Sequence, residues 1–195
     1  MTTLGYAILG LLAREELSGY DLASRMRARV GHFWEARHSQ IYPELARLEE
    51  GGLVTHRVVE QQDRPDKKVY EITPAGLEVL KEWVTEPPAP RPARDELVLK
   101  AYSLWLAEPE EAIALFRGQE LRHEERLLAY EGVRAWMEKE WGKDVLRTDS
   151  PRFASYAALR CGILYERGYA EWCRWVAERL AEDQRNRGPK NRKSV

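Results

Sequence analysis

The sequence has few cysteines, almost no net charge and no long apolar run. Its 195 residues include two cysteines and four histidines, and the formal net charge is −1 at pH 7. The longest nearly apolar stretch, residues 4–13, is far shorter than the ~20 residues that cross a bilayer. The first residues also lack the basic region and cleavage site of a signal peptide. We therefore expect a cytoplasmic protein with no membrane partner, whose first residues belong to the fold.

The two cysteines cannot form a disulfide with each other if they share one helix. Cys161 and Cys173 lie twelve residues apart in a predicted helix, which at ~1.5 Å per residue separates them by roughly 18 Å. We interpret both as small core or interface hydrophobes, the usual setting of a free cysteine. An inter-subunit bridge or a redox role is the alternative.

The sequence patterns of common active sites are missing. We find no phosphate-binding or dinucleotide-binding glycine loop, no G-x-S-x-G elbow and no H-E-x-x-H zinc motif. The histidines show no metal-ligand spacing with one another or with the cysteines; they are His32, His38, His56 and His123. We therefore predict that the protein is not an enzyme and has no catalytic residue, metal or cofactor.

Near-neutral charge gives no global signal for nucleic acid, whose binding depends on a basic surface. A DNA-binding site must then rest on locally placed residues. The one plainly basic stretch is the tail, residues 185–195, with no acid after Asp183. We expect this tail to be disordered. It is either a solubilising end or a source of non-specific attraction to phosphate.

Prolines divide the chain into two parts of different character. Hydrophobic residues make up 44% and charged residues 32%, as in ordinary globular proteins. Residues 87–94 contain four prolines, which cannot continue a helix and favour an extended connection. We predict a first domain over residues 1–86, a linker over 87–94 and a helical domain over 95–184.

The first domain is predicted to contain three helices, a hairpin and a fourth helix. The expected helices span 4–13, 19–30 (capped by Ser18) and 39–50; the strands lie within 53–60 and 69–73; and the last helix begins at Pro74 with Leu77, Leu80 and Val84 facing inward. This order is that of a winged helix-turn-helix. The fold class is therefore mainly α with a small β-hairpin, that is, α+β.

The third predicted helix has a polar face suited to the major groove of double-stranded DNA. Ile41, Leu45 and Leu48 share one side, which leaves Gln40, Glu44 and Arg47 opposite. Further basic residues lie at the hairpin tip, where a wing reaches the DNA backbone. The candidate DNA contacts are Arg37, His38, Ser39, Gln40, Tyr42 and Arg47 at the helix, and Arg64, Lys67 and Lys68 at the wing.

Long helical patterns follow the linker. We predict helices over 95–106, from Pro109 to about Trp141, and from Pro151 to about Asp183. The polar stretch 117–126 suggests an exposed segment or one that reaches a partner subunit. An apolar stripe in the last helix predicts packing against another helix; its members are Phe153, Ala157, Cys161, Leu164, Trp172, Val176 and Leu180.

Three stretches of the first domain resemble the DNA-binding domain of the PadR family: Gly19-Tyr20-Asp21-Leu22, residues 39–54 with the pattern I-Y-P-x-L, and residues 68–76 with Y-x-I-T-x-x-G. The resemblance covers roughly residues 1–85. It implies a homodimeric repressor that binds a pseudo-palindromic operator and is relieved by a small aromatic or hydrophobic effector. It also implies DNA contacts by Tyr42 with Ser39 and Gln40, and by Lys67 or Lys68. The acids Glu44, Glu49 and Glu50 should then face the core edge or solvent.

Phenolic acids and flat hydrophobic drugs are effectors in that family, so the resemblance also directs attention to aromatic residues. The chain has seven tryptophans, and an aromatic-walled pocket would suit such ligands. Tyr102 and Trp105 are the candidate effector contacts, because their helix follows the linker. The alternative is that the tryptophans fill a dimer core. The alternative for the whole protein is a winged-helix interaction scaffold with no operator, which the neutral charge favours.

Overall fold

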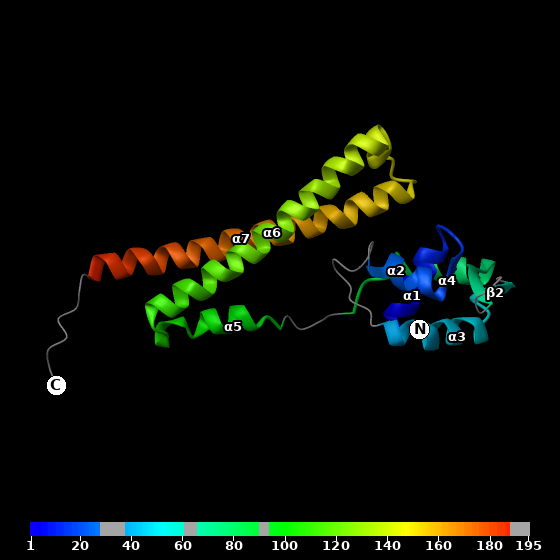
Figure 1. Ribbon diagram of the computed structural model, residues 1–195, viewed down its shortest axis with the longest axis horizontal. Helices are drawn as coiled ribbons and strands as arrows, with labels where there is room; N and C mark the ends of the chain where they lie inside the picture. Colours follow the sequence, from blue (N-terminus) through cyan, green and yellow to red (C-terminus); the bar gives the residue numbers. More distant parts are fainter. Residues whose placement is uncertain (28–37, 61–65, 90–93, 188–195) are drawn as a thin grey trace. The chain divides into compact units, whose positions relative to one another are not determined.

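The computed structural model describes residues 1–27, 38–60, 66–89 and 94–187 of the chain. These residues form two compact units, Met1–Pro90 and Arg91–Val195, each with its own core (Figure 1). Within the ranges described, no helix combines the length and apolarity needed to span a membrane.

The first unit is a winged helix-turn-helix with a small antiparallel sheet. Its helices are α1 (Thr3–Leu12), α2 (Gly19–Arg25), α3 (His38–Glu50) and α4 (Pro74–Trp83), and its strands are β1 (Leu17–Ser18), β2 (Val54–Val59) and β3 (Lys67–Ile72). The mainly α fold with a β-hairpin is confirmed. The sheet order is β1-β3-β2, so the hairpin gains a third strand that the sequence analysis did not predict.

Local capping explains where the helices of this unit begin and end. The Ser18 hydroxyl accepts a hydrogen bond from the Asp21 N–H at 3.1 Å, and the Thr73 hydroxyl accepts one from the Gly76 N–H at 3.1 Å. Both residues therefore cap their helices, as predicted. The Thr73 hydroxyl also donates to the Gly52 carbonyl at 2.7 Å. Gly52 adopts a φ of +68° immediately after α3, which a residue without a Cβ tolerates best. The turn after α3 is thereby tied to the start of α4.

The core of the first unit lies between α1, α2, α3 and the sheet. Ile8, Leu22 and Leu45 are fully buried there. The prediction that Leu77 and Val84 face inward is wrong. Leu77 is 37% exposed, and Val84, which follows the end of α4 at Trp83, is 65% exposed. Trp83 instead stacks on Tyr6 of α1, with ring centroids 4.3 Å apart.

The second unit is built on two long helices. Its elements are α5 (Glu96–Tyr102), the 3₁₀ turn η2 (Leu104–Leu106), α6 (Pro109–Trp141), the 3₁₀ turn η3 (Gly142–Leu146) and α7 (Pro151–Arg187). Figure 1 shows α6 and α7 lying side by side. The prediction of one helix over 95–106 is wrong. The α-helix stops before Ser103, and the following tight turn lets Leu104 pack on the core around Phe116.

Two apolar clusters join α6 to α7. Phe116 packs with Cys173 and Ala177, and Tyr130 packs with Leu159 and Ile163. The predicted stripe on α7 is therefore only partly right. Leu164 is 58% exposed, and Ala157 and Cys161 are also exposed, because the buried side of the helix is displaced toward Ile163. Both cysteines are free thiols, and burial raises the pKa of Cys173 to about 11.

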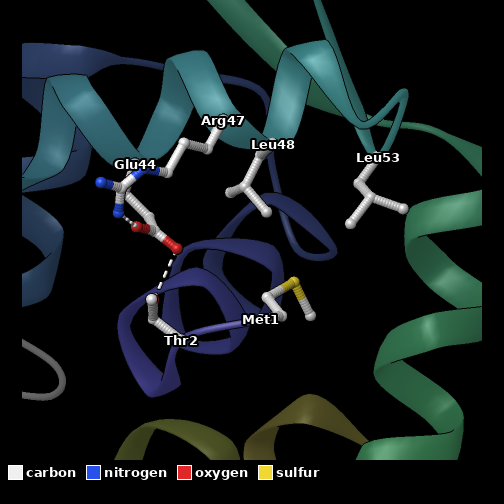
Figure 2. Close-up of a pocket in the computed structure, with 6 residues that line it drawn as sticks. All are labelled: Met1, Thr2, Glu44, Arg47, Leu48 and Leu53. Atoms are coloured by element: carbon white, nitrogen blue, oxygen red, sulfur yellow. Dashed lines mark hydrogen bonds and ion pairs between the residues drawn. The ribbon is translucent and has the colours of Figure 1, made fainter.

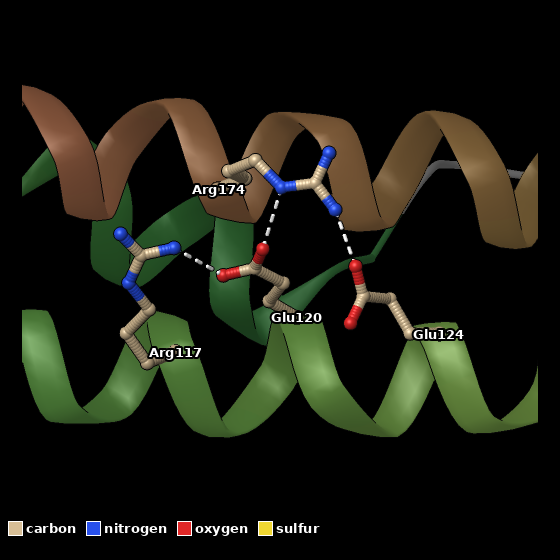
Figure 3. A network of polar contacts seen from close by, with 4 residues as sticks. All are labelled: Arg117, Glu120, Glu124 and Arg174. Carbon is tan, nitrogen blue, oxygen red and sulfur yellow. Dashed lines mark hydrogen bonds and ion pairs between the residues drawn. The ribbon is translucent and has the colours of Figure 1, made fainter.

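A polar seam also joins α6 to α7, and Figure 3 shows four of its residues. The buried Glu120 carboxylate accepts hydrogen bonds from Arg117 at 2.7 Å and from Arg174 of α7 at 2.6 Å. Burial pushes the pKa of Glu120 upward, but the two guanidinium groups outweigh it and hold this pKa below its usual value. Arg174 also pairs with Glu124. This charged set is satisfied within one chain.

His123 is also buried in the seam. It contacts the buried Glu166 carboxylate, and its ring stacks on Tyr169 with centroids 4.3 Å apart. The prediction that residues 117–126 are exposed or cross to a partner is thus wrong for Glu120 and His123. A polar residue on a long helix is buried at low cost when the facing helix supplies the opposite charge or a hydrogen-bond partner.

Candidate nucleic-acid interface

Helix α3 has one buried side and one exposed side, as the sequence predicts. Ile41, Leu45 and Leu48 are at most 2% exposed. Ser39, Gln40 and Arg47 lie on the exposed side. The helix therefore presents hydroxyl, amide and guanidinium groups, which can contact base edges and phosphates.

Two of the three acidic residues of α3, Glu44 and Glu49, are held away from this exposed side or paired, whereas Glu50 is exposed at the end of the helix. The prediction that Glu44 lies on the polar face is wrong, because it is only 5% exposed. Its carboxylate accepts hydrogen bonds from the Thr2 hydroxyl at 2.5 Å and from Arg47 at 3.3 Å, as Figure 2 shows. Glu49 contacts His56 of β2. Glu44 therefore lies at the core edge, as expected from the resemblance, and carries little negative charge into the interface.

A pocket lies beside the same contact. It is lined by Met1, Thr2, Glu44, Arg47, Leu48 and Leu53 (Figure 2). The apolar side chains of Met1, Leu48 and Leu53 form much of its wall. The buried Glu44 carboxylate already accepts hydrogen bonds from Thr2 and Arg47. These bonds link the start of α1 to α3 and orient the Arg47 side chain.

Tyr42 lies on the exposed side of α3 and against the start of α2. Its side chain is 48% exposed. A Cβ atom built on Gly19 would lie 2.5 Å from the Tyr42 ring, closer than real Cβ atoms approach. Only glycine at position 19 leaves room for the ring in this place. Tyr20, the next residue, is 72% exposed and lies in the same turn.

The wing is the hairpin of β2 and β3. Val54 to Val59 pair with Ile72 to Lys67 in antiparallel register. Lys68 is exposed. Lys67 is partly exposed, and its ammonium group forms an ion pair with Asp21 of α2 at 2.8 Å. The two predicted wing lysines therefore differ in the charge that surrounds them.

Some predicted contacts cannot be placed. Arg37 and Arg64 lie outside the described residues, and His38 is described only as the first residue of α3. The predicted effector contacts are described. Tyr102 is 85% exposed and Trp105 is 82% exposed on the second unit, and the pocket of Figure 2 is lined by other residues. Their role stays a prediction.

The described residues offer no arrangement of three or more histidine, cysteine, aspartate or glutamate side chains that could hold a metal ion. The chemistry available on α3 and the wing is that of hydrogen bonding and charge pairing. The roles of Gly19, Asp21 and Glu44 were not predicted from the sequence. The motif Gly19-Tyr20-Asp21-Leu22 was the one signal that could have drawn attention to the first two.

Comparison with known proteins agrees with this geometry. Residues 8–82 match the transcriptional regulator PadR-like family, and residues 93–181 match the virulence activator alpha C-terminal family. The negative transcriptional regulator PadR of Bacillus subtilis is 35% identical over 94% of this chain and 100% of its own length. A probable transcriptional regulator of Mycobacterium tuberculosis is also 35% identical, over 92% of this chain and 98% of its own.

Solved structures show the same similarity in three dimensions. The crystal structure of Bacillus subtilis PadR with operator DNA matches with a TM-score of 0.82 and 35% identity, covering 92% of this chain and 98% of that one. The structure of the same protein in complex with p-coumaric acid matches with a TM-score of 0.75 and 34% identity, covering 92% of this chain and 99% of that one. The structure of the virulence activator AphA of Vibrio cholerae matches with a TM-score of 0.71 and 27% identity, covering 92% of this chain and 99% of that one. Sequence and structure together therefore show that this chain belongs to the PadR-like family of transcriptional regulators.

Proposed function

We propose that this chain is a homodimeric repressor that binds a pseudo-palindromic operator and leaves it when a small aromatic molecule binds. The observation that carries the proposal is the match, over 92% of the chain, to Bacillus subtilis PadR in complex with operator DNA. The identity to that negative regulator, 35%, exceeds the 27% identity to the activator AphA. Repression is therefore better supported than activation.

The exposed side of α3 is the proposed reading surface. Ser39, Gln40 and Tyr42 would contact base edges, since the first turns of a recognition helix enter the major groove. Arg47, Lys68 and the other predicted basic residues, Arg37, His38 and Arg64, would contact phosphates and set the register. Lys67, which is paired with Asp21, would contribute less. The proposal assigns residues 1–86 to DNA binding, 87–94 to a linker and 185–195 to a basic tail.

The second domain, residues 95–184, is proposed to form the dimer. Leu121 and Leu128 lie seven residues apart on α6 and are 60% and 76% exposed, and Leu164 of α7 is 58% exposed. Exposed leucines repeated along long helices are suited to burial against a second copy. Two copies would supply the two recognition helices that a pseudo-palindromic site requires. A regulator of this kind acts on cytoplasmic DNA, which is where we place the protein.

The proposed effector is a small aromatic acid, because a relative at 34% identity has been solved with p-coumaric acid. Tyr102 and Trp105 are exposed aromatic side chains that could stack on such a ring. We expect p-coumaric acid to release the protein from DNA and Trp105→Ala to reduce this release. Trp136→Ala is the control, because Trp136 is 53% exposed elsewhere on the second unit. Equal release from both variants would remove Trp105 from the proposed site.

Fluorescence anisotropy tests DNA binding directly. The purified protein is titrated onto a duplex from upstream of its own gene and onto a scrambled duplex, at several KCl concentrations. We expect specific binding whose logarithm falls with log salt by ~0.9 per neutralised phosphate. Tyr42→Ala should weaken specific binding roughly tenfold or more, and Arg47→Ala should mainly reduce the salt slope.

Lys81→Ala is the control for Arg47→Ala, because Lys81 forms an exposed ion pair with Glu78 on α4 at 2.6 Å. It removes one positive charge from the same unit away from α3. Salt-independent behaviour, or equal affinity for the two duplexes, would support an interaction scaffold instead of a regulator.

A further inference from the structure

One turn of the first unit contacts both elements of the proposed DNA-binding surface. Strand β1 pairs with β3 of the wing, with Ser18 opposite Val69. Gly19 follows directly and lies against the Tyr42 ring of the recognition helix. Asp21, two residues later, forms an ion pair with Lys67 at the start of β3. The start of α2 therefore connects α3 to the wing.

The Asp21 carboxylate is fixed in this turn. One of its oxygens accepts a hydrogen bond from the Ser18 hydroxyl at 2.7 Å and lies 2.8 Å from the Lys67 ammonium group. The hydrogen bond with Lys67, followed by that from Ser18, lowers the pKa of Asp21. The group is therefore an anion at neutral pH. Its side chain is 40% exposed and that of Lys67 is 38% exposed, so the pair is open to solvent.

A carboxylate and a phosphate compete for the same ammonium group. Both are oxygen anions that accept charge-assisted hydrogen bonds from lysine. Exposed ion pairs are weak in water, so the pair can open when another anion approaches. While it is closed, Asp21 neutralises the charge of Lys67 beside the surface that would meet the DNA backbone.

We infer that Asp21 is a specificity-determining residue: by occupying Lys67 it lowers sequence-independent attraction to phosphate, so that contacts from α3 decide where the protein binds. This inference rests on the proposed function. Non-specific binding is supplied almost entirely by phosphate contacts, whereas Ser39, Gln40 and Tyr42 contribute only on the right sequence. Removing one cation from the non-specific interaction therefore raises the ratio of specific to non-specific affinity. The exposed Lys68 is left as the principal lysine of the wing.

The test is a double-mutant cycle on the full-length protein with the own-upstream and scrambled duplexes. Asp21→Asn keeps the shape and removes the charge. We expect it to tighten binding to the scrambled duplex by roughly fivefold and to steepen the salt slope by ~0.9 for each additional phosphate contact. Affinity for the upstream duplex should rise less, so the specificity ratio falls. In the Asp21→Asn background, Lys67→Met should cancel the gain, because the gain is expected to act through the Lys67 ammonium group.

Glu78→Gln is the matched control, because it removes the same charge from an exposed ion pair on α4 and should leave the specificity ratio unchanged. Thermal unfolding of each variant checks that the fold is intact. Weaker binding of Asp21→Asn to both duplexes, or an unchanged salt slope, would overturn the inference while wild-type discrimination remains. A wild type that binds both duplexes equally would overturn the proposed function, and the inference with it.

Discussion

Glycines mark the places where segments of this chain approach most closely. A Cβ atom built on Gly76 would lie 2.1 Å from the Leu53 carbonyl oxygen. That carbonyl also accepts a hydrogen bond from the Thr73 N–H at 3.0 Å. The first turn of α4 is therefore seated directly on the backbone that follows α3, and only glycine fits there.

Gly76→Ala should destabilise the first unit by about 2–4 kcal/mol, because the clash is with backbone that cannot rotate away. Urea denaturation measures this. Gly118→Ala is the control: Gly118 lies within α6 with no atom near its missing Cβ, so alanine should stabilise that helix by up to ~1 kcal/mol. Similar effects at the two positions would show that the close contact at Gly76 is unimportant.

Gly19→Ala should separate DNA binding from stability. Its new methyl group meets the end of the Tyr42 side chain rather than backbone, so the ring can move at little cost to folding. We expect a loss of affinity for the upstream duplex of roughly tenfold, with a melting temperature within a few degrees of wild type. Unchanged affinity would mean that the position of the Tyr42 ring is not needed for binding.

The residues of the site were only partly predictable from the sequence. Periodicity placed Ser39, Gln40 and Arg47 on an exposed face, because that pattern depends on the helix alone. The burial of Glu44 and the Asp21–Lys67 pair depend on contacts with segments 42 and 46 residues away. No local pattern marks such contacts, so Glu44 was placed on the wrong face and Asp21 received no role.

Among the elements, α5 packs on α7 through Leu97 and Ala101, and a side-chain hydrogen bond that involves its cap also joins the two helices. Asp95 accepts hydrogen bonds from the Leu97 and Val98 N–H groups, and its other oxygen accepts one from the Tyr169 hydroxyl at 2.6 Å. This bond from Tyr169 is the main reason that the pKa of Asp95 is lowered. A lowered carboxylate pKa contributes stability above its unfolded value and loses it as pH falls through the folded value.

Tyr169→Phe should therefore cost about 0.5–1.5 kcal/mol of stability at neutral pH. The difference in unfolding free energy between variant and wild type should narrow as the pH falls below 3.8, the ordinary pKa of an aspartate. Asp95 then becomes protonated in both proteins. Unfolding measured at several pH values tests this. Tyr156→Phe is the control: its hydroxyl donates to Glu138 at 2.6 Å in an exposed position, so it should cost less. A pH-independent difference would mean that Asp95 is not the group responsible.

The helices and the hairpin were predicted largely from their caps and periodicity. The errors occur where contacts with distant segments determine whether a strand forms, where a helix ends or which residues are buried. Strand β1 has only two residues and exists because β3 lies beside it. The break at Ser103 serves the packing of Leu104. The buried part of the 117–126 stretch depends on Arg174 and Glu166 of α7. None of these partners is visible in a window of local sequence.

For the whole molecule, near-neutral net charge is compatible with DNA binding because three acids near α3 are buried or paired. Glu44 is buried, Glu49 contacts His56 and Asp21 is paired with Lys67. Toward solvent the helix presents the polar and basic groups of Ser39, Gln40 and Arg47, and its exposed acid, Glu50, is its last residue. The net charge of −1 thus averages over a molecule whose charges are locally arranged.

Hydroxyl-radical footprinting of the protein on its own upstream DNA tests operator binding by a dimer most directly. Two recognition helices related by a two-fold axis should protect two patches about one helical turn, ~34 Å, apart, and Tyr42→Ala should abolish both at the same protein concentration. We predict this paired footprint at a pseudo-palindromic sequence. A single unpaired patch would contradict the dimer, and uniform weak protection along the duplex would contradict sequence-specific recognition by α3.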